Sequence, residues 1–341
     1  MKRLLLGMSG GVDSAAAAVL LLRAGYEVEG ATLLLAPDGA QDAADAARCA
    51  AVLGIPHRTV DLRGTFRREV MDVFAAEYRA GRTPNPCVLC NRAVKFGAML
   101  RLALEAGFDG VATGHYARIE EAGGRFLLRA SPTEKDQSYM LYSLSQEQLG
   151  RAVLPLAELS KSEVRALARE AGLPAAQKPE SQDICFVPDG DYAGFLARFA
   201  GEPFTPGDFV DTEGNVLGRH GGLARYTVGQ RKGLGAFGRP MYVVSLDAAH
   251  NRVVVGPEGS QYRGACTVSG VNWIPWDTPP GPLRCRAKIR YRAPAAPCTV
   301  TPLADGRARV EFEEPQRSVT PGQSAVFYDG SLVLGGGVIE S

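Results

Sequence analysis

The 341-residue chain lacks a membrane-length hydrophobic run and an excess of charge of either sign. The apolar run 15–22 has eight residues, whereas a membrane span needs about 20. The apolar start of the chain ends at Gly7, too early for a signal peptide. Thirty-eight Lys and Arg face 37 Asp and Glu, a formal charge of +1, which excludes a uniformly basic nucleic-acid coat and an acidic disordered chain. We therefore expect a cytoplasmic protein with no membrane contact.

Cysteine is also scarce, and its spacing is irregular. Seven cysteines, an odd number, do not form the dense framework of a disulfide-stapled secreted domain. Free thiols in a reducing compartment are therefore expected. One close pair stands out, Cys87-x-x-Cys90. Burial in the core is expected for the cysteines within helical or strand patterns, which are Cys49, Cys266, Cys285 and Cys298.

The first 199 residues alternate short apolar runs with Ala- and Leu-rich helical patterns. Strands are expected at 3–8, 26–35, 55–62 and 110–113, and helices at 14–24, 42–53, 65–79 and 90–106. Such alternation predicts an α/β domain over 1–199, with a parallel sheet covered on both faces. Ser160 and Glu163 have the spacing of a capping box that starts a further helix.

Beyond residue 200 the pattern changes to short strand-like runs punctuated by Pro and Gly. Runs at 242–246 and 252–255 indicate a small β-rich domain over 200–263. Runs at 284–292, 308–312, 325–328 and 332–334, with a hairpin signal at Asp329-Gly330, indicate a β-barrel or sandwich over 264–341.

The most informative motif lies where the first strand turns into the first helix. Paired glycines let the backbone approach a ligand closely, and the helix N-terminus offers N–H groups to phosphate. Asp13 would hold Mg²⁺ or cap the helix, while a plain N-capped helix after a tight turn is the alternative. The candidate nucleotide-binding residues here are Gly7, Met8, Ser9, Gly10, Gly11, Val12, Asp13 and Ser14.

Two polar, turn-rich segments carry the candidate reactive cysteines. In the first segment, two prolines precede an expected helix: Thr83-Pro84-Asn85-Pro86-Cys87-Val88-Leu89-Cys90. We therefore expect Cys90 to lie near the helix N-terminus, where the helix dipole would favour its thiolate. Cys185 lies in a second such segment, 178–186. Three thiols outside the predicted core thus indicate sulfur chemistry.

With these motifs, the chain resembles the bacterial tRNA-uridine 2-sulfurtransferases of the ATP pyrophosphatase (PP-loop) superfamily. Ser9-Gly10-Gly11-Val12-Asp13-Ser14 resembles their pyrophosphate loop, and the resemblance extends over nearly the whole chain. It implies a PP-loop domain of the adenine nucleotide α-hydrolase-like fold, then a central domain and a C-terminal β-barrel that bind tRNA. The motifs that complete it are 83–91, 112–117, 135–139, 178–186, 226–235, 288–292 and 320–323.

The resemblance implies ATP-dependent 2-thiolation of wobble uridine 34 in tRNAs for Lys, Glu and Gln. ATP, with Mg²⁺, would adenylate the C2 oxygen; Leu33 and Gly114 match further nucleotide contacts. Cys185 would carry a persulfide received from a sulfur-donor or relay protein, and Cys90 would act as nucleophile. The products would be thiouridine and a Cys90–Cys185 disulfide. In an alternative order, Cys90 first frees hydrosulfide from the persulfide.

The chain departs from the family form at Cys87, where aspartate is expected. That places the acid–base assignment in doubt and opens a second mechanism. Cys87, Cys90 and Cys185 are three potential ligands for a [4Fe–4S] cluster that carries sulfide; otherwise no metal is expected. A structural zinc site normally needs four ligands, and there is no second Cys-x-x-Cys.

Candidate tRNA contacts come partly from the resemblance and partly from charge. In segment 284–292, alternate residues are Lys or Arg, so a single strand would present five cations on one face. Edge-strand protection is the alternative. His115 follows a strand at the ligand-binding edge of the sheet, and 135–137 could be a simple turn. The residues that match family contacts are Asn85, Pro86, Cys87, His115, Lys135, Asp136, Gln137, Arg290, Tyr291 and Gln323.

Two other functions compete with this interpretation. A PP-loop synthetase for a small metabolite would explain the loop but not the basic segment. A non-catalytic tRNA-binding protein would explain the basic segment and leave the loop and the three cysteines without a role.

Overall fold

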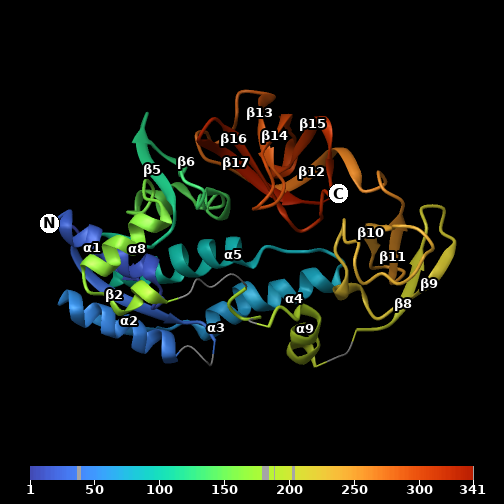
Figure 1. Cartoon of the computed structure of the whole chain (residues 1–341). Coiled ribbons are helices and arrows are strands. Elements are labelled where there is room, and N and C mark those ends of the chain that lie inside the picture. The colour runs from blue at the N-terminus through green and yellow to red at the C-terminus, as the bar shows by residue number, and fades with distance from the viewer. Residues whose placement is uncertain (37–39, 179–183, 188, 202–203, 341) are drawn as a thin grey trace.

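The computed structural model describes residues 1–36, 40–178, 184–187, 189–201 and 204–340. Figure 1 shows an α/β domain at the left, a small β domain at the right and a barrel above and between them. Within these residues, no helix is both long and apolar enough to cross a membrane.

The N-terminal domain is built on a five-stranded parallel sheet in the order β3-β2-β1-β4-β7. Because β2 and β4 flank β1 on opposite sides, the strand order reverses there, and ligands of open α/β sheets bind at such a switch point. The strands are β1 (Arg3–Gly7), β2 (Glu27–Leu34), β3 (His57–Asp61), β4 (Gly110–Ala112) and β7 (Ala152–Val153).

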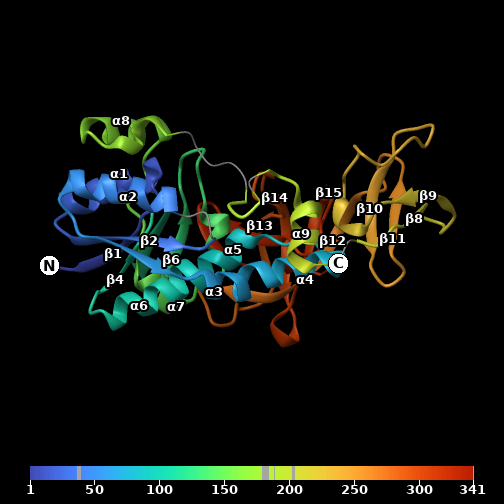
Figure 2. The same cartoon turned by 90° about the horizontal axis from the view of Figure 1, so that it is seen from below.

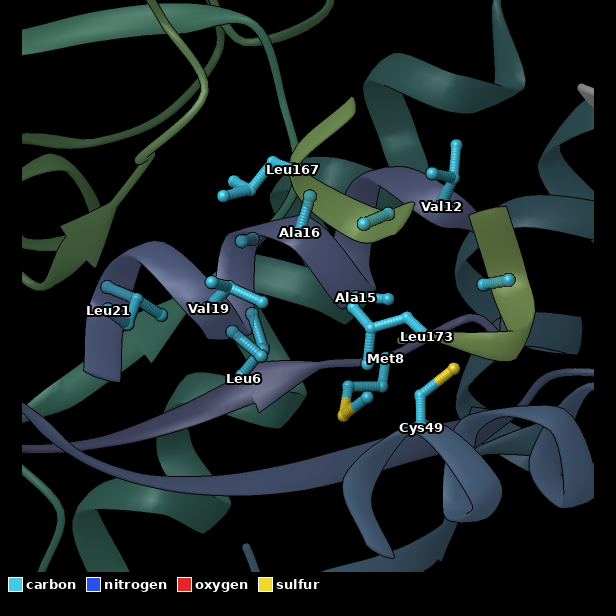
Figure 3. Packing of buried hydrophobic residues seen from close by; sticks show 14 of the residues in the cluster. Leu6, Met8, Val12, Ala15, Ala16, Val19, Leu21, Cys49, Leu167 and Leu173 are labelled. Atoms are coloured by element: carbon cyan, nitrogen blue, oxygen red, sulfur yellow. The ribbon is translucent and has the colours of Figure 1, made fainter. Parts of the chain in front are cut away.

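Helices cover both faces of this sheet, because successive apolar residues of β1 point to opposite sides. Leu4 and Leu6 pack with α1, α2 and α8, while Leu5 packs with α6. Figure 3 shows Leu6 among the residues of the first cluster. Figure 2 shows α1, α2 and α8 on one side of the sheet and α6 on the other. The helices are α1 (Val12–Arg23), α2 (Ala40–Leu53), α8 (Lys161–Glu170) and α6 (Met99–Glu105). The predicted capping box is confirmed, with Ser160 and Glu163 capping α8.

Two long helices pass through π-helical segments. The first comprises α3 (Arg63–Phe66), η1 (Arg67–Met71) and α4 (Asp72–Arg79); the second comprises α5 (Pro86–Leu89), η2 (Cys90–Ala98) and α6. Such segments are frequent at functional sites, and the second carries two of the candidate cysteines. The remaining helical elements are η3 (Ser138–Met140), α7 (Gln146–Gly150), η4 (Pro174–Gln177), α9 (Tyr192–Ala200), η5 (Leu223–Arg225) and η6 (Ala304–Gly306).

The C-terminal domain is a closed barrel in the order β12-β15-β14-β13-β16-β17, with β17 pairing back to β12. This confirms the α/β class followed by a C-terminal barrel. The hairpin of β5 (Ala117–Ala122) and β6 (Arg125–Ala130), unexpected from the sequence, joins the start of β17, where Leu332 pairs with Arg129. The barrel strands are β12 (Tyr262–Trp273), β13 (Leu283–Lys288), β14 (Ala296–Pro302), β15 (Ala308–Arg317), β16 (Ser324–Asp329) and β17 (Leu332–Ile339).

The middle domain is a four-stranded sheet in the order β10-β11-β8-β9, as expected of a small β-rich unit. Its core gathers the aromatic residues Phe209 and Tyr226 around Val243 and Val253. The strands are β8 (Gly207–Val210), β9 (Val216–His220), β10 (Tyr242–Asp247) and β11 (Arg252–Gly256).

Candidate active site

The glycine-rich loop connects β1 to α1 at the switch point of the sheet. Gly10 adopts φ +70°, and a Cβ there would lie 2.7 Å from the Asp42 carbonyl oxygen, so only glycine fits. The Ser14 hydroxyl donates to the Gly11 carbonyl and accepts from the Ser9 N–H, which fixes the turn. Gly11, the N-cap of α1, provides no side-chain cap. The N–H groups of the first turn are therefore available to an anion.

Gly114, at the end of β4, comes within contact of the same loop. A Cβ at Gly114 would lie 2.8 Å from the Asp13 carbonyl carbon and 2.9 Å from the Ser14 nitrogen. Leu33, near the end of β2 on the other side of β1, is half-buried. The structure therefore brings all the predicted nucleotide-binding positions to one edge of the sheet, where the residues present fit ATP.

Asp13 neither caps α1 nor stands open as a metal ligand, in contrast to the expectation. Its carboxylate accepts from Lys161 Nζ at 2.7 and 2.8 Å and from the Tyr116 hydroxyl at 2.6 Å. Lys161 begins α8, 148 residues along the chain, so sequence spacing gave no signal of this pair. The pair ties the loop to α8.

The cysteine segment enters its helix earlier than the sequence indicated. Asn85 is the N-cap, accepting from the Cys87 N–H at 3.2 Å, and Pro86 is the first helical residue. Cys87 is exposed in the first turn, whereas Cys90 is a turn further on and buried. Desolvation raises the pKa of Cys90 to about 12. The expectation of a thiolate favoured by the helix dipole at Cys90 is therefore wrong, since that benefit is confined to the first turn.

Cys185 lies in the short described stretch 184–187, which packs against the helix formed by α3, η1 and α4. Phe186 makes edge contacts with Phe66 and Phe74, with ring centroids 5.5 and 5.3 Å apart. Phe186 and Cys90 belong to the same apolar cluster. The negative charges of Cys185 and Cys87 both act to raise the pKa of Cys90. The three thiols thus lie in one neighbourhood. The rest of the predicted segment, 179–183, lies outside the described residues.

A lysine that the sequence interpretation missed lies among these thiols. The positive charge of Lys95 lowers the pKa of each of the three, against the larger effect of desolvation. Lys95 follows Cys90 by five residues within η2, the spacing that a π-helix places on one face. Its only hydrogen bond among the described residues is to His115 Nε2, at 3.4 Å.

His115 is buried under the site rather than exposed to a macromolecular substrate. Its Nδ1 lies 2.7 Å from the Thr113 hydroxyl, and burial holds its pKa well below the usual value. The neutral ring accepts from Lys95 on one side and donates to Thr113 on the other. His115 therefore positions the Lys95 ammonium.

No group of three or more His, Cys, Asp or Glu side chains in the described part of the chain is arranged to hold a metal ion. Cys87, Cys90 and Cys185 share a neighbourhood without forming a ligand set there. The described residues therefore give no support to the [4Fe–4S] alternative, and no step is derived through a cluster.

Comparisons with known proteins agree with this geometry. Three family descriptions match in order: tRNA methyl transferase HUP domain over residues 2–189, tRNA methyl transferase PRC-barrel domain over 193–257, and aminomethyltransferase beta-barrel domain over 263–339. The tRNA-specific 2-thiouridylase MnmA of Moorella thermoacetica is 50% identical over 353 residues, covering 99% of each chain. That of Acetivibrio thermocellus is 49% identical over 356 residues, with the same coverage. The chain belongs to the tRNA-specific 2-thiouridylase family.

A solved U34-tRNA thiolase from Methanococcus maripaludis, with its [4Fe–4S] cluster, is also similar. It is 18% identical, covers 58% of this chain and 67% of its own, and has a TM-score of 0.37. This likeness is too slight to bear on mechanism. Membership of the 2-thiouridylase family, in contrast, makes the chain a sulfurtransferase that modifies tRNA.

Within this thiouridylase, the family-matched stretch 135–137 forms a turn that supports the site. The Asp136 carboxylate accepts from the backbone N–H groups of Ser131 and Ser138, both at 3.0 Å. Gln137 exchanges two hydrogen bonds with the Tyr116 backbone, at 2.7 and 3.1 Å. Asp136 and Gln137 therefore fix the backbone around Tyr116, the partner of Asp13.

The barrel docks directly onto the chain leading to Cys87. Gln323 donates to the Thr83 carbonyl at 2.7 Å, and the Thr83 N–H donates to the Pro321 carbonyl at 2.9 Å. A Cβ at Gly322 would lie 2.8 Å from the Thr83 nitrogen. Gln323, expected as a tRNA contact, thus fixes the position of the cysteine segment relative to the barrel.

The basic segment is only partly a strand. β13 ends at Lys288, so Arg284, Arg286 and Lys288 alternate along it as expected. Arg290, beyond the strand, turns to donate to the Arg317 carbonyl at 2.9 Å, and the prediction of one five-cation face over 284–292 is wrong. Tyr291 is half-buried, with its ring centroid 5.9 Å from that of Tyr139.

Proposed function

We propose that the chain catalyses ATP-dependent 2-thiolation of the wobble uridine, position 34, of tRNAs for Lys, Glu and Gln. One observation carries this proposal: the phosphate-binding loop and the three thiols belong to one domain, with the barrel docked beside Cys87. The family membership gives the reaction class, and the proximity of the loop, the thiols and the barrel supports the roles proposed below.

In the first step, the uridine C2 oxygen attacks the α-phosphate of ATP and pyrophosphate leaves. The oxygen thereby becomes part of AMP, a far better leaving group. We propose that the N–H groups at the start of α1 bind the pyrophosphate, because they are uncapped and at the positive end of the helix dipole. Gly10 and Gly114 leave room for the phosphates, and Leu33 contacts the nucleotide. Mg²⁺ would accompany ATP, with no ligand assigned to this chain.

In the second step, sulfur reaches C2 from a persulfide on Cys185. The terminal sulfur attacks C2 and AMP departs, which leaves the tRNA joined to Cys185 through two sulfur atoms. Cys90 then attacks the Cys185 sulfur, which releases 2-thiouridine and leaves a Cys90–Cys185 disulfide. The persulfide comes from a donor or relay protein, and a thiol reductant must restore the cysteines before the next cycle.

Cys90 must lose its proton for this attack, and Lys95 favours its thiolate. Burial raises the pKa of Cys90 to about 12, so only a small fraction is thiolate at neutral pH. The positive charge of Lys95 lowers this pKa and thereby increases the reactive fraction.

On the tRNA side, we propose contacts from the loop 85–87, from Lys135 and from Arg290 and Tyr291. The buried Nε of Arg290, which has no hydrogen-bond partner among the described residues, supports that assignment.

Single-turnover thiolation with a preformed persulfide tests the roles of the two cysteines. Cys185→Ser is expected to yield no thiouridine. Cys90→Ser is expected to accumulate tRNA linked to the protein through a bond that dithiothreitol cleaves. Cys266→Ser, a buried cysteine of the barrel, is the matched control and is expected to turn over normally. Multiple turnover by Cys90→Ser would refute its role.

A further inference from the structure

Two cysteines of the barrel form a close pair that the thiolation chemistry does not use. Cys285 on β13 and Cys298 on β14 are directly opposite each other in an antiparallel pairing. Their Sγ atoms lie 3.8 Å apart, close enough for a hydrogen bond between the thiols. The neighbours Arg284 and Arg286 are exposed, so the strand alternation turns both sulfur atoms toward the barrel interior.

The backbone geometry suits a covalent link between these sulfur atoms. Residues opposite each other in antiparallel strands have Cα atoms about 4.5–5.5 Å apart, within the range of about 4.4–6.8 Å that disulfides span. Cys298 is 3% exposed, but Cys285 is only half-buried, which gives a small oxidant access to the pair. Little movement of β13 and β14 is therefore needed.

The pair also differs chemically from an ordinary buried cysteine. The hydrogen bond from Cys285 lowers the pKa of Cys298, and the same bond raises the pKa of Cys285. Cys298 is thus the thiol that loses its proton more readily, while Cys285 keeps its proton in the hydrogen bond between the two sulfur atoms. Cys266 also faces the interior, but among the described residues its thiol has no hydrogen bond to another cysteine. Desolvation, with the charge of Cys298 adding to it, raises the pKa of Cys266 to about 12.

We propose that Cys285 and Cys298 are a redox-active pair that hydrogen peroxide converts into a disulfide across β13 and β14. One thiolate attacks peroxide, which gives a sulfenic acid and, after protonation of the leaving hydroxide, water. The second thiol then displaces the sulfenic hydroxyl as water. Two thiols and one peroxide thus yield one disulfide and two waters. The bond would close a loop around the turn that carries Arg290 and Tyr291.

The test uses full-length reduced protein treated with stoichiometric hydrogen peroxide, then a thiol block and peptide mapping by mass spectrometry. A linked peptide containing Cys285 and Cys298 is expected, and it should disappear on treatment with dithiothreitol. The wild-type protein suffices for this measurement, so it does not depend on whether a variant folds. Sulfinic acid at either cysteine without the linked peptide would overturn the proposal, as would a link from Cys298 to Cys266.

Matched variants separate this pair from the other thiols. Cys266→Ser should retain the link, and Cys285→Ser should lose it and leave a sulfenic acid at Cys298 that dimedone traps. The Cys90→Ser/Cys185→Ser double variant should form the link as the wild type does. Loss of the link in that double variant would show that it arises from catalytic disulfide exchange and would refute an independent pair.

Discussion

Gly114→Ala adds one methyl group at the point where the end of β4 meets the glycine-rich loop. The new Cβ would lie 2.8 Å from the Asp13 carbonyl carbon and 2.9 Å from the Ser14 nitrogen. Both are backbone atoms of the first turn of α1, so no side chain can rotate away. Ordinary contact begins at 3.4 Å, so the loop and the strand must separate by roughly 0.6 Å. Overpacking of this kind costs about 1–3 kcal/mol.

The displaced atoms are those that we assign to pyrophosphate, so the effect should appear in ATP use. A misplacement of about 1 Å lowers rates by about a hundredfold, so kcat/KM for ATP is expected to fall ten- to a hundredfold. Steady-state pyrophosphate release in the presence of tRNA measures it. Gly264→Ala is the control, since a Cβ there meets nothing within 4 Å and the residue lacks a positive φ. A kcat/KM within twofold of wild type would refute the placement of ATP.

Three further perturbations test other parts of the site. Lys161→Met removes a charged partner of Asp13. At about 1.5–3 kcal/mol for such a bond, it should weaken ATP binding by about ten- to a hundredfold, measured by calorimetry. Arg23→Met, which breaks an exposed pair between the same two helices, should change it less than twofold, and equal effects would contradict the role of Lys161. Lys95→Met removes the charge that lowers the pKa of Cys90, so single-turnover thiolation should slow at pH 7 and recover as the pH rises. Lys95→Arg, which keeps the charge, should stay near wild type. An unchanged pH profile in Lys95→Met would exclude this role. Arg284→Ala with Arg286→Ala should lower the salt dependence of tRNA binding by about one unit of slope per residue, and an unchanged slope would favour edge protection.

The sequence predicted those features whose cause is local. The glycine pair requires a tight turn, Ser160 and Glu163 form a cap within four residues, and apolar periodicity distinguishes helix from strand. These patterns predicted the parallel sheet with the glycine-rich loop at one edge, because the end of a strand and the start of the next helix are close in sequence.

Features that depend on distant contacts could not be predicted in this way. Asp13 is neutralised by Lys161 from another helix, and burial of Cys90 arises from packing with Phe186 almost one hundred residues away. Cations continue to alternate in the sequence beyond Lys288, but the strand ends at that residue. Period-two spacing in a sequence does not show where a strand ends. In each case tertiary packing decided a property that the local pattern left open.

Thiolation by metal-stripped protein is the most direct test of the central claim. The mixture holds ATP, Mg²⁺, unmodified tRNA for Glu and a persulfide donor, and nucleoside mass spectrometry detects the product. The account predicts 2-thiouridine at position 34 and no requirement for iron. Absence of product, with activity restored by anaerobic iron–sulfur loading, would contradict the persulfide mechanism and assign Cys87, Cys90 and Cys185 to a cluster.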